Sequence, residues 1–420
     1  MNSSLQSSLL NKKKIFPIWF MRQAGRYLPE YQKIRRKNKN FINFCLNVKD
    51  ATEVSLQPIN RFNLDAVIVF SDILLILNAV GQKVEFKEKT GPILENYDLN
   101  KFYKTPDKNF IKNLKNVYKI LKNIKKELPK EKALIGFAGS PWTLLVYMIN
   151  KGSPKKKKNL LKNLKKKEVI KIIKRLEHLV YVHCKEQILA GADVIQLFDS
   201  WASLINKGSL KELCINPNKN IINKLKKNFP NIPVICFPKG INENINTFIK
   251  TVNPHGISID YDINLKKLDL NNNVVFQGGM NPKFLLGNNQ KMFREAKKYL
   301  DFFKNKPYIF NLGHGILPKT KPENVKKLIE FVREVRPHGI SIDYDVNLKK
   351  LNLNNNVVFQ GGMNPKFLLG NNKRMFKEAK KYLDFFKNKP YIFNLGHGIL
   401  PKTKPENVKR LVEFVRSYNL

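Results

Sequence analysis

Mostly apolar runs of three to five residues alternate with longer, Lys-rich stretches of helical period through the first three quarters of the chain. Eight such runs occur: Pro17–Met21, Ala66–Phe70, Ala133–Phe137, Val194–Phe198, Pro233–Phe237, Gly256–Ile259, Val274–Phe276 and Tyr308–Phe310. Runs of this kind fit strands of a parallel sheet that is buried on both faces. Eight strand–helix repeats predict an α/β fold, a (β/α)8 TIM barrel. A doubly wound open sheet is the alternative, but no Gly-rich phosphate-binding turn follows the first run.

Polar residues stand at the carboxyl ends of these runs. They are Arg22 and Arg26, Ser71 and Asp72, Ser140, Asp199 and Ser200, Lys239, Asp260, Gln277, and His314. Barrel enzymes build their active sites at the ends where the strands finish. The pattern therefore predicts that function lies on that face of the barrel.

The first run leads into a turn with two arginines. Arg22 and Arg26 flank Gln23-Ala24-Gly25, and Leu28-Pro29 then starts a predicted helix. Two guanidinium groups at the end of a buried strand form a double fork suited to carboxylates or phosphates. The alternative is that they pair with structural acids.

Two further residues stand out by their position. Asp72 follows a strand with no other charge, so a buried carboxylate there needs partners or binds a proton. It either serves the site or pairs with Arg22 and its neighbouring helix. Ser140-Pro141 predicts a helix N-cap followed by proline at the first helical position, and that helix carries Tyr147 as a core or pocket residue.

The C-terminal part of the chain is duplicated. Residues 254–333 recur at 337–416 with a constant offset of 83. Each copy contains three strand–helix units, so we expect residues 1–336 to hold one complete barrel and residues 337–420 to form an appendage. Short connections to the fifth strand favour closure by the first copy, which makes His314 the expected site residue. In the rival arrangement the second copy closes the barrel, and His397 takes that place.

Composition limits the possible partners. The net charge is +44, from 77 Lys and Arg against 33 Asp and Glu. These lysines are spread over nearly every helical stretch, which indicates solvated faces and not a nucleic-acid patch. Such a field still speeds the arrival of an anionic substrate.

Cysteine usage and hydropathy bear on the compartment. The four cysteines, Cys45, Cys184, Cys214 and Cys236, lie far apart without metal-ligand spacing. They predict free thiols in a reducing cytosol. No apolar stretch reaches membrane-spanning length, so we expect no membrane partner and a cytoplasmic protein.

Five motifs carry a family resemblance. They are MRQAGRYLPEY at 21–31, FSDIL at 70–74, GFAGSPWTLLVYM at 136–148, QLFDSWA at 196–202 and NLGHGI at 311–316. In this order they resemble the uroporphyrinogen decarboxylases of haem biosynthesis. The resemblance implies a (β/α)8 barrel that converts the four acetates of uroporphyrinogen to methyls without a metal or organic cofactor. It also implies a cytoplasmic homodimer.

The same resemblance implies roles for individual residues. Asp72 would sit at the centre of the cleft and accept hydrogen bonds from pyrrole N–H groups. The remaining substrate-binding positions would be Arg22, Gln23, Ala24, Gly25, Arg26, Tyr147, Ser200 and His314, with His397 as the alternative to His314. Arg22 and Arg26 would join Asp72 as catalytic residues.

Two rival functions come from other classes. A cobalamin-linked methyltransferase would need a His-x-Cys zinc pair and a later Cys, but Gly315-Ile316 follows His314 and no Cys follows Cys236. The other rival is an inactive, basic barrel that only binds. Turnover of uroporphyrinogen without added metal would separate the decarboxylase from both.

Overall fold

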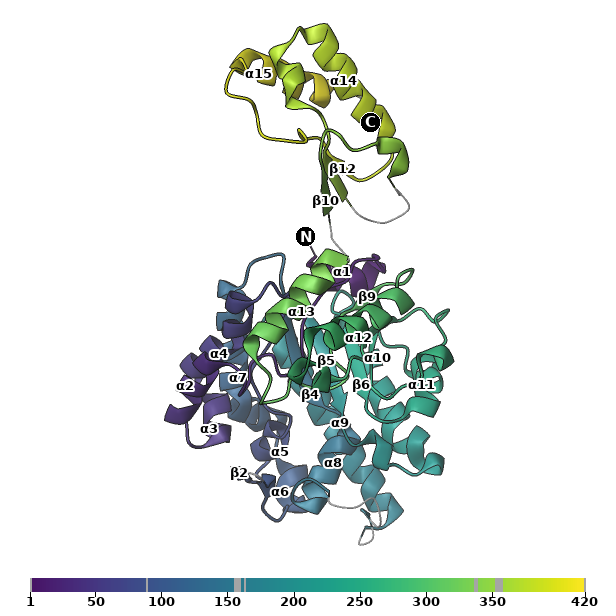
Figure 1. Ribbon diagram of the computed structural model, residues 1–420. Helices are drawn as coiled ribbons and strands as arrows, with labels where there is room; N and C mark the ends of the chain where they lie inside the picture. Colours follow the sequence, from purple (N-terminus) through teal and green to yellow (C-terminus); the bar gives the residue numbers. More distant parts are fainter. Residues whose placement is uncertain are drawn as a thin grey trace. The chain divides into compact units, whose positions relative to one another are not determined.

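The computed structural model describes residues 2–87, 90–154, 160–161, 164–335, 339–351 and 358–418. The chain divides into two compact units, Met1–Phe331 and Val332–Leu420. Figure 1 shows the first as strands enclosed by helices, and the second as a small group of strands and helices.

Among the described residues of the first unit, seven parallel strands form one sheet in the order β1-β4-β5-β6-β7-β8-β9. Their bounds are β1 Ala66–Ile68, β4 Ala133–Gly139, β5 Val194–Asp199, β6 Val234–Pro238, β7 Gly256–Ile259, β8 Val275–Gly278 and β9 Tyr308–Ile309. Each strand coincides with one of the predicted apolar runs. The predicted α/β barrel architecture is therefore confirmed.

The first apolar run, Pro17–Met21, differs from the prediction, because it is not a regular strand. In the barrel, it lies between β9 on one side and β1 on the other. Ile18 forms a single parallel bridge with Phe310, whose N–H donates to Pro17 O at 2.8 Å. On its other side, the N–H of Asp65 donates to Ile18 O at 2.8 Å. The run thus joins the two ends of the sheet.

Side chains replace the missing strand pairing. Asp65 Oδ2 accepts from the N–H of Ile18 at 2.6 Å. Asn311 Oδ1 accepts from the N–H of Met21 at 3.1 Å. A backbone N–H held by a side chain cannot enter a strand ladder, which explains why the run bridges the sheet at one residue only.

The helices of the first unit surround the sheet. Neighbouring members of the outer ring pack on each other, namely α4 on α7, α7 on α9, α9 on α10 and α10 on α11. The α-helices are α1 Ser4–Asn11, α2 Pro29–Lys37, α3 Phe41–Leu46, α4 Val48–Arg61, α5 Leu75–Ala79, α6 Leu99–Lys104, α7 Asp107–Glu127, α8 Pro141–Asn150, α9 Lys166–Leu189, α10 Asn216–Asn228, α11 Ile245–Val252, α12 Asn289–Phe302 and α13 Pro322–Val335. Helix α2 confirms the predicted helix start, with Pro29 in its first turn.

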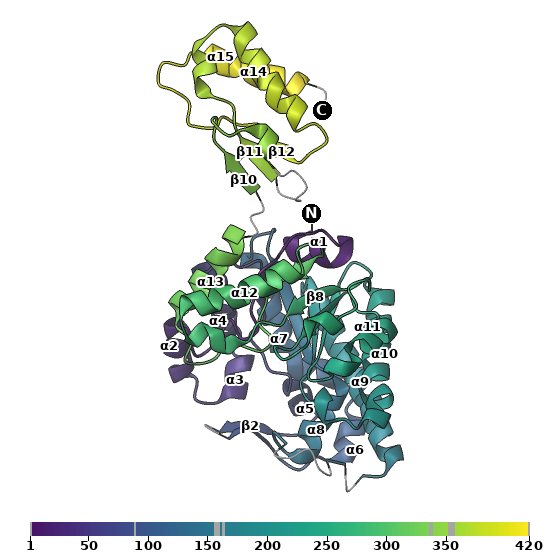
Figure 2. The same cartoon turned by 45° about the vertical axis from the view of Figure 1, so that its right-hand side comes forward.

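Shorter elements complete this unit. A two-stranded antiparallel hairpin, β2 Val84–Lys87 with β3 Gly91–Leu94, lies at the end of the unit opposite to α1 (Figures 1 and 2). The 3₁₀ turns are η1 Ala202–Leu204, η2 Lys207–Ser209, η4 Asn242–Asn244, η5 Leu265–Lys267 and η6 Pro282–Leu286, and η3 Lys211–Ile215 is a π-helical turn.

The N-terminal segment forms helix α1. Ser3 caps it, since its hydroxyl accepts from the N–H of Gln6 at 3.3 Å and the Gln6 side chain accepts in return from the N–H of Ser3. Leu5 and Leu9 are fully buried and belong to the barrel core. Helix α1 contacts β4 and β9, so it closes one end of the barrel.

A buried polar group crosses the barrel interior. The indole N–H of Trp19 donates to Gln277 Oε1 at 2.9 Å. The Gln277 amide in turn donates to Ser258 Oγ at 2.7 Å and to Gln196 Oε1 at 3.1 Å. These side chains come from the first run, β8, β7 and β5. Because a buried network stabilises only when its members are satisfied, this one fixes the relative positions of the four segments.

The second unit repeats part of the barrel. Its parallel strands β10 Gly339–Ile342, β11 Val358–Gly361 and β12 Tyr391–Ile392 pair in that order, in the register of β7, β8 and β9 shifted by 83. Helices α14 Asn372–Phe385 and α15 Pro405–Ser417 and the 3₁₀ turns η7 Leu348–Lys350 and η8 Pro365–Leu369 accompany them. In this structure the first copy therefore supplies the barrel strands.

Several remaining expectations concern single segments. Residues 155–159 and 162–163 lie outside the described residues, and α9 begins at Lys166. All four cysteines are buried free thiols. None of the helices within the described ranges combines the length and hydropathy needed to cross a bilayer.

The role of Asp65 in closing the barrel is testable. Asp65→Ala should lower the free energy of unfolding by about 1–3 kcal/mol, because the buried N–H of Ile18 loses its acceptor. Urea denaturation followed by tryptophan fluorescence measures this in the first unit alone, since Trp19, Trp142 and Trp201 all lie there. Asp65→Asn keeps one acceptor oxygen and should lose less. Equal stability of Asp65→Ala and the unsubstituted chain would contradict this account.

Candidate functional site

The candidate site lies where the strands of the first unit end. The turn after Pro17–Met21, the segments after β1, β5 and β9, and helix α8 each contribute side chains to it. These segments are far apart in the sequence, and the barrel brings their carboxyl ends to one face.

Arg22 is held against the loop after β9. It is one of the few residues other than glycine with a left-handed backbone, at φ 60°. The N–H of Ile316 donates to Met21 O at 2.9 Å, which fixes the loop beside it. A Cβ on Gly315 would lie 2.4 Å from Arg22 Cδ, so only glycine leaves room for the arginine side chain. The NLGHGI motif therefore positions Arg22 as well as His314.

Asp72 is half-buried beyond the end of β1. Its Oδ1 accepts from the N–H of Leu74 at 2.8 Å. Burial raises the pKa of the carboxyl to about 6, against the opposing effects of the Leu74 hydrogen bond and of nearby Arg22. The carboxylate form is thus dominant at neutral pH but carries a desolvation cost, as expected for an acid that awaits a cationic partner.

Burial also shifts the pKa of Arg22, but it lowers this pKa, because burial disfavours the charged form of a base. Its side chain reaches solvent, yet the surrounding protein desolvates it and lowers its pKa. Asp72 and Tyr147 raise that pKa, and Arg26 lowers it. Arg22 is therefore exposed to solvent on one side and surrounded by protein on the other. Asp72, Tyr147 and Arg26 each lie close enough to Arg22 to shift its pKa.

Tyr147 is presented by α8, beside Trp201 from the loop after β5. The two rings meet edge to face, with centroids 5.9 Å apart. Trp201 is itself fixed, because the indole N–H of Trp142 donates to its carbonyl at 2.8 Å. Burial raises the pKa of Tyr147, and Asp72 raises it further, so its phenol keeps its proton as a donor.

The start of α8 corrects one expectation. Ser140 stands at the N-cap with Pro141 next, but its hydroxyl makes no capping bond to the helix. It donates instead to Asn218 Oδ1 at 2.9 Å, on α10. The reason is that Asn218 is buried beside it and needs a partner, whereas the helix gains its start from proline alone.

Ser200 is half-buried immediately after the buried Asp199. Thr143 donates its hydroxyl to Asp199 Oδ1 at 2.6 Å and accepts from the N–H of Trp201 at 3.0 Å. Burial raises the pKa of Asp199 to about 6, opposed by its hydrogen bonds to Thr143, Cys214 and Asn218. These bonds fix the loop that carries Ser200 to α8.

His314 follows β9 and is half-buried. Burial lowers its pKa to about 4, and the positive charges of Arg22 and Lys239 lower it further. The imidazole is therefore neutral at pH 7 and can donate through one nitrogen while it accepts through the other. Its electrical coupling to Arg22 places it in the same cluster.

Lys239 and Asp260 also belong to this face, although the motifs do not single them out. They follow β6 and β7, and the charge of Lys239 acts on both His314 and Asp260. Asp260 accepts from the N–H of Gly240 at 2.6 Å, and burial raises its pKa to about 6. Their positions at strand ends are the signal in the sequence that points to them.

The side chain of Gln23 makes its hydrogen bonds inside the protein. Its side chain is fully buried, accepting from the N–H of Phe20 at 3.0 Å and donating to Ala66 O at 3.0 Å. Both ends of the amide are thus used to tie the first run to β1. Its neighbours Ala24 and Gly25 are half-buried, and Arg26 is exposed.

His397, the alternative to His314, is exposed in the second unit. The described residues of that unit include none of the other predicted site residues. His314 lies in the first unit, where Arg22 is close enough to lower its pKa.

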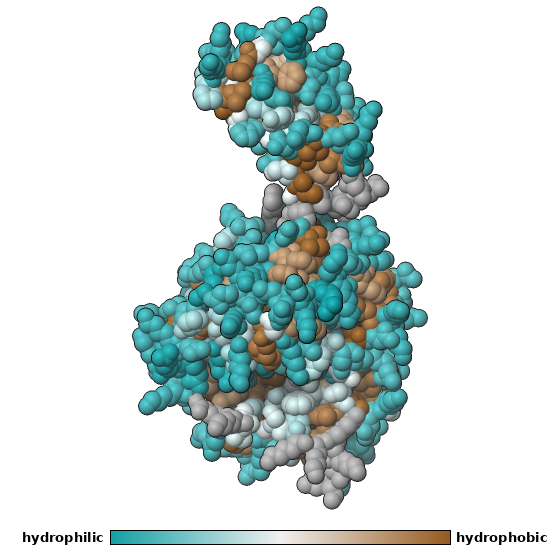
Figure 3. All heavy atoms as spheres, in the orientation of Figure 1, coloured by the Kyte–Doolittle hydropathy of each residue, from teal (hydrophilic) through white to brown (hydrophobic). Residues whose placement is uncertain are grey.

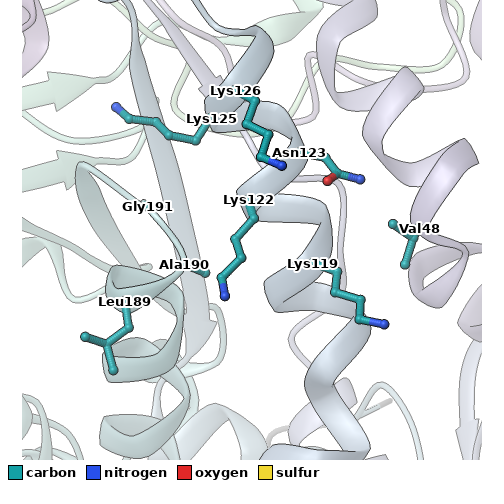
Figure 4. Close-up of a pocket in the computed structure, with 9 residues that line it drawn as sticks. All are labelled: Val48, Lys119, Lys122, Asn123, Lys125, Lys126, Leu189, Ala190 and Gly191. Carbon is teal, nitrogen blue, oxygen red and sulfur yellow. The ribbon is translucent and has the colours of Figure 1, made fainter.

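A separate lysine-lined cavity of about 440 Å³ lies between α4, α7 and the end of α9 (Figure 4). Lys119, Lys122 and Lys126 extend from α7, and Lys125 pairs with Asp193 at 2.7 Å. Asp193 precedes β5, so this cavity lies near strand beginnings, the opposite end from that used by barrel active sites. Within the described residues, no three His, Cys, Asp or Glu side chains lie together in a way that could hold a metal ion.

Comparison with known proteins gives one consistent family. The family model described as uroporphyrinogen decarboxylase (URO-D) matches residues 10–335 and matches again at 332–418. A uroporphyrinogen decarboxylase from Rickettsia felis is 47% identical over 332 residues, covering 77% of this chain and 94% of that protein. The one from Rickettsia bellii is 45% identical over 327 residues, covering 76% and 94%.

A solved structure shares the fold. A methyltransferase from Methanosarcina mazei covers 79% of this chain and 97% of its own, with a TM-score of 0.63 and 18% identity. At that identity the likeness concerns the fold alone.

The raised pKa of Asp72 predicts how stability depends on pH. A carboxyl whose pKa rises on folding stabilises the folded state below its unfolded pKa, and this stabilisation is lost as the pH rises through about 6. Asp72→Asn should therefore become more stable relative to the unsubstituted chain as the pH goes from about 4 to about 7. Urea denaturation at each pH measures the difference. Glu131→Gln, at an exposed carboxylate, is the control, and a difference for Asp72→Asn that does not change with pH would contradict the prediction.

Proposed function

This chain belongs to the uroporphyrinogen decarboxylase family, and we propose that its first unit removes CO₂ from the four acetate side chains of uroporphyrinogen III to give coproporphyrinogen III in haem biosynthesis. One observation carries the proposal: the family match spans residues 10–335, the part of the chain that builds the barrel and its cluster of Arg22, Asp72, Tyr147 and His314.

The chemistry requires an electron sink next to the acetate. A proton adds to the pyrrole carbon that bears the acetate and makes the ring cationic. The C–CO₂ bond then breaks, CO₂ leaves, and its electron pair neutralises the ring. A second proton adds to the exocyclic methylene while the first leaves the ring carbon, which gives a methyl. Each cycle consumes one proton overall, and the substrate is its own electron sink, so we propose that no cofactor takes part.

Asp72 is the proposed centre of this chemistry. Its carboxylate would accept hydrogen bonds from the pyrrole N–H groups and stabilise the positive charge that develops on the ring. The desolvation that raises its pKa supports this role, because a carboxylate that is poorly solvated beforehand gains more from a cation. Leu74 N–H holds it in place, so little reorganisation is needed in the transition state.

Arg22 and Arg26 are the proposed anchors for the acidic side chains. Uroporphyrinogen carries eight carboxylates, and a guanidinium binds a carboxylate with two parallel hydrogen bonds. Arg22 is close enough to Asp72 for their pKa values to be coupled, so a carboxylate held by Arg22 would lie beside the ring held by Asp72. Both arginines are proposed as catalytic residues through this positioning and charge.

The remaining proposed contacts surround these. Tyr147, Ser200 and His314 would donate hydrogen bonds to acetate or propionate groups, with the neutral state of His314 suited to a donor of fixed direction. Ala24 and Gly25 would contact the substrate through their backbone. Gln23 would act as a positioning residue for the turn, since both ends of its side chain are occupied.

We further propose that residues 1–336 form the complete catalytic barrel and that 337–420 are an appendage. The register of the second copy supports this, since its strands pair with one another. The four free thiols support a cytoplasmic location, because reducing compartments keep such thiols unpaired. A homodimer is proposed from the family resemblance.

Replacing Asp72 tests the mechanism. Asp72→Asn should lower kcat for uroporphyrinogen by about 100-fold or more, because the amide cannot balance the ring cation. Anaerobic turnover, measured by chromatography of the oxidised porphyrins, gives the rate, and the thermal unfolding profile shows whether the fold is kept. Turnover near that of the unsubstituted chain would refute the central role of Asp72.

Comparing the two equivalent histidines tests which copy completes the site. His314→Asn should raise KM and lower kcat, whereas His397→Asn should leave both unchanged. The two substitutions are chemically identical and sit at matched positions, so each controls for the other. A loss confined to His397→Asn would mean that the second copy closes the active barrel.

A further inference from the structure

The second unit carries an apolar groove of about 480 Å³ between the loop after β12 and helix α15. The loop contributes Phe393, Leu395 and Ile399, and the helix contributes Val408, Val412 and Val415. Figure 3 shows apolar atoms at the surface of this unit within a largely hydrophilic exterior. A groove of this size in a small unit needs an explanation, because exposed apolar patches mark interaction sites.

The duplication supplies an internal reference for this groove. In the 3₁₀ turns η6 and η8, the equivalent residues Leu286 and Leu369 are both 46% exposed. At the groove, equivalent residues differ sharply, since Ile316 is 4% exposed and its equivalent Ile399 is 56% exposed. On the strands, Ile309 is fully buried in the barrel core, whereas its equivalent Ile392 is 52% exposed. The second copy therefore lacks the barrel core and, at the groove, it also lacks the cover that keeps Ile316 buried in the first copy.

In the first unit, the cover at this position is the run Pro17–Met21. Its backbone bridges Phe310, the equivalent of Phe393, and the ring of Phe20 meets that of Phe310 with centroids 6.3 Å apart. Its last carbonyl, on Met21, accepts from the N–H of Ile316. The groove is thus shaped for an extended segment that pairs with the edge of the strand and fills the space beside the last helix.

The chain contains two such grooves but one covering run. The sequence of Pro17–Met21 occurs once, whereas the segment it covers occurs twice. If two chains exchanged this run, the number of uncovered grooves would stay the same, because the run that covers the groove of one unit would leave the groove of another unit uncovered. Two chains, however, can bury two uncovered grooves against each other.

We propose that a second copy of this chain covers the groove, with β12 pairing edge to edge with β12 of the second copy. Within the described residues β12 is an edge strand of its sheet, so its outer backbone groups are available. A twofold axis between two identical edges makes the pair antiparallel and brings Phe393, Ile399 and Val412 of both copies together. This interface lies in the second unit and is independent of any dimer formed by the barrel.

Sedimentation velocity of the full chain over a range of concentrations tests the interface. Ile399→Asp and Val412→Asp should each weaken self-association by about tenfold or more, because each would bury an unpaired charge. Leu369→Asp is the matched control, an exposed leucine in the same unit outside the groove, and should leave association unchanged. Absence of self-association, or association unaffected by both groove substitutions, would overturn the proposal.

Cysteine crosslinking tests which segment occupies the groove. The four native cysteines are buried, so Ile392→Cys adds an accessible thiol on β12 with little background. A short thiol crosslinker should join two chains at Ile392→Cys and not at Leu369→Cys. Dissociation by the groove substitutions without crosslinking at Ile392→Cys would mean that another segment, such as Pro17–Met21 of the second copy, occupies the groove, and would overturn the edge-to-edge arrangement.

Discussion

The structure depends on one short stretch of backbone that is paired on both sides. Pro17–Met21 joins β9 to the segment before β1, and Asp65 and Asn311 accept its N–H groups in place of a regular ladder. The contacts that close the barrel therefore also position the turn that carries Arg22 and Arg26. Because Arg22 follows Met21 directly, loss of these contacts would move the Arg22 guanidinium away from Asp72 and His314.

Burial has the largest effect on the pKa values of the candidate site residues. Burial is the largest cause of the pKa shifts of Arg22, Asp72, Tyr147 and His314, and neighbouring charges only modify it. Water is therefore already partly displaced before a substrate arrives. In the proposed function, a polyanionic ligand with a cationic transition state would use both kinds of charge, since the arginines would bind its carboxylates and Asp72 would stabilise its ring.

Sequence patterns predicted the strands and the face that bears the site, because both follow from hydrophobic periodicity and from where polar residues interrupt it. They did not predict that Pro17–Met21 is irregular, because side chains bond there to backbone N–H groups in place of a neighbouring strand. The N–H groups of Ile18 and Met21 bond to Asp65 and Asn311, a long-range choice that no local pattern encodes. Nor does a local pattern show that both ends of the Gln23 amide bond to the backbone, at Phe20 and Ala66.

The stacked aromatic pair behind the last strand occurs in both copies. Phe303 lies 4.4 Å from Tyr308, and Phe386 lies 4.2 Å from Tyr391, between ring centroids in each case. The described parts of this segment therefore keep the same strand register and the same aromatic stack with and without the rest of the barrel strands. Contacts within the segment, and not its neighbours in the barrel, thus determine this local geometry.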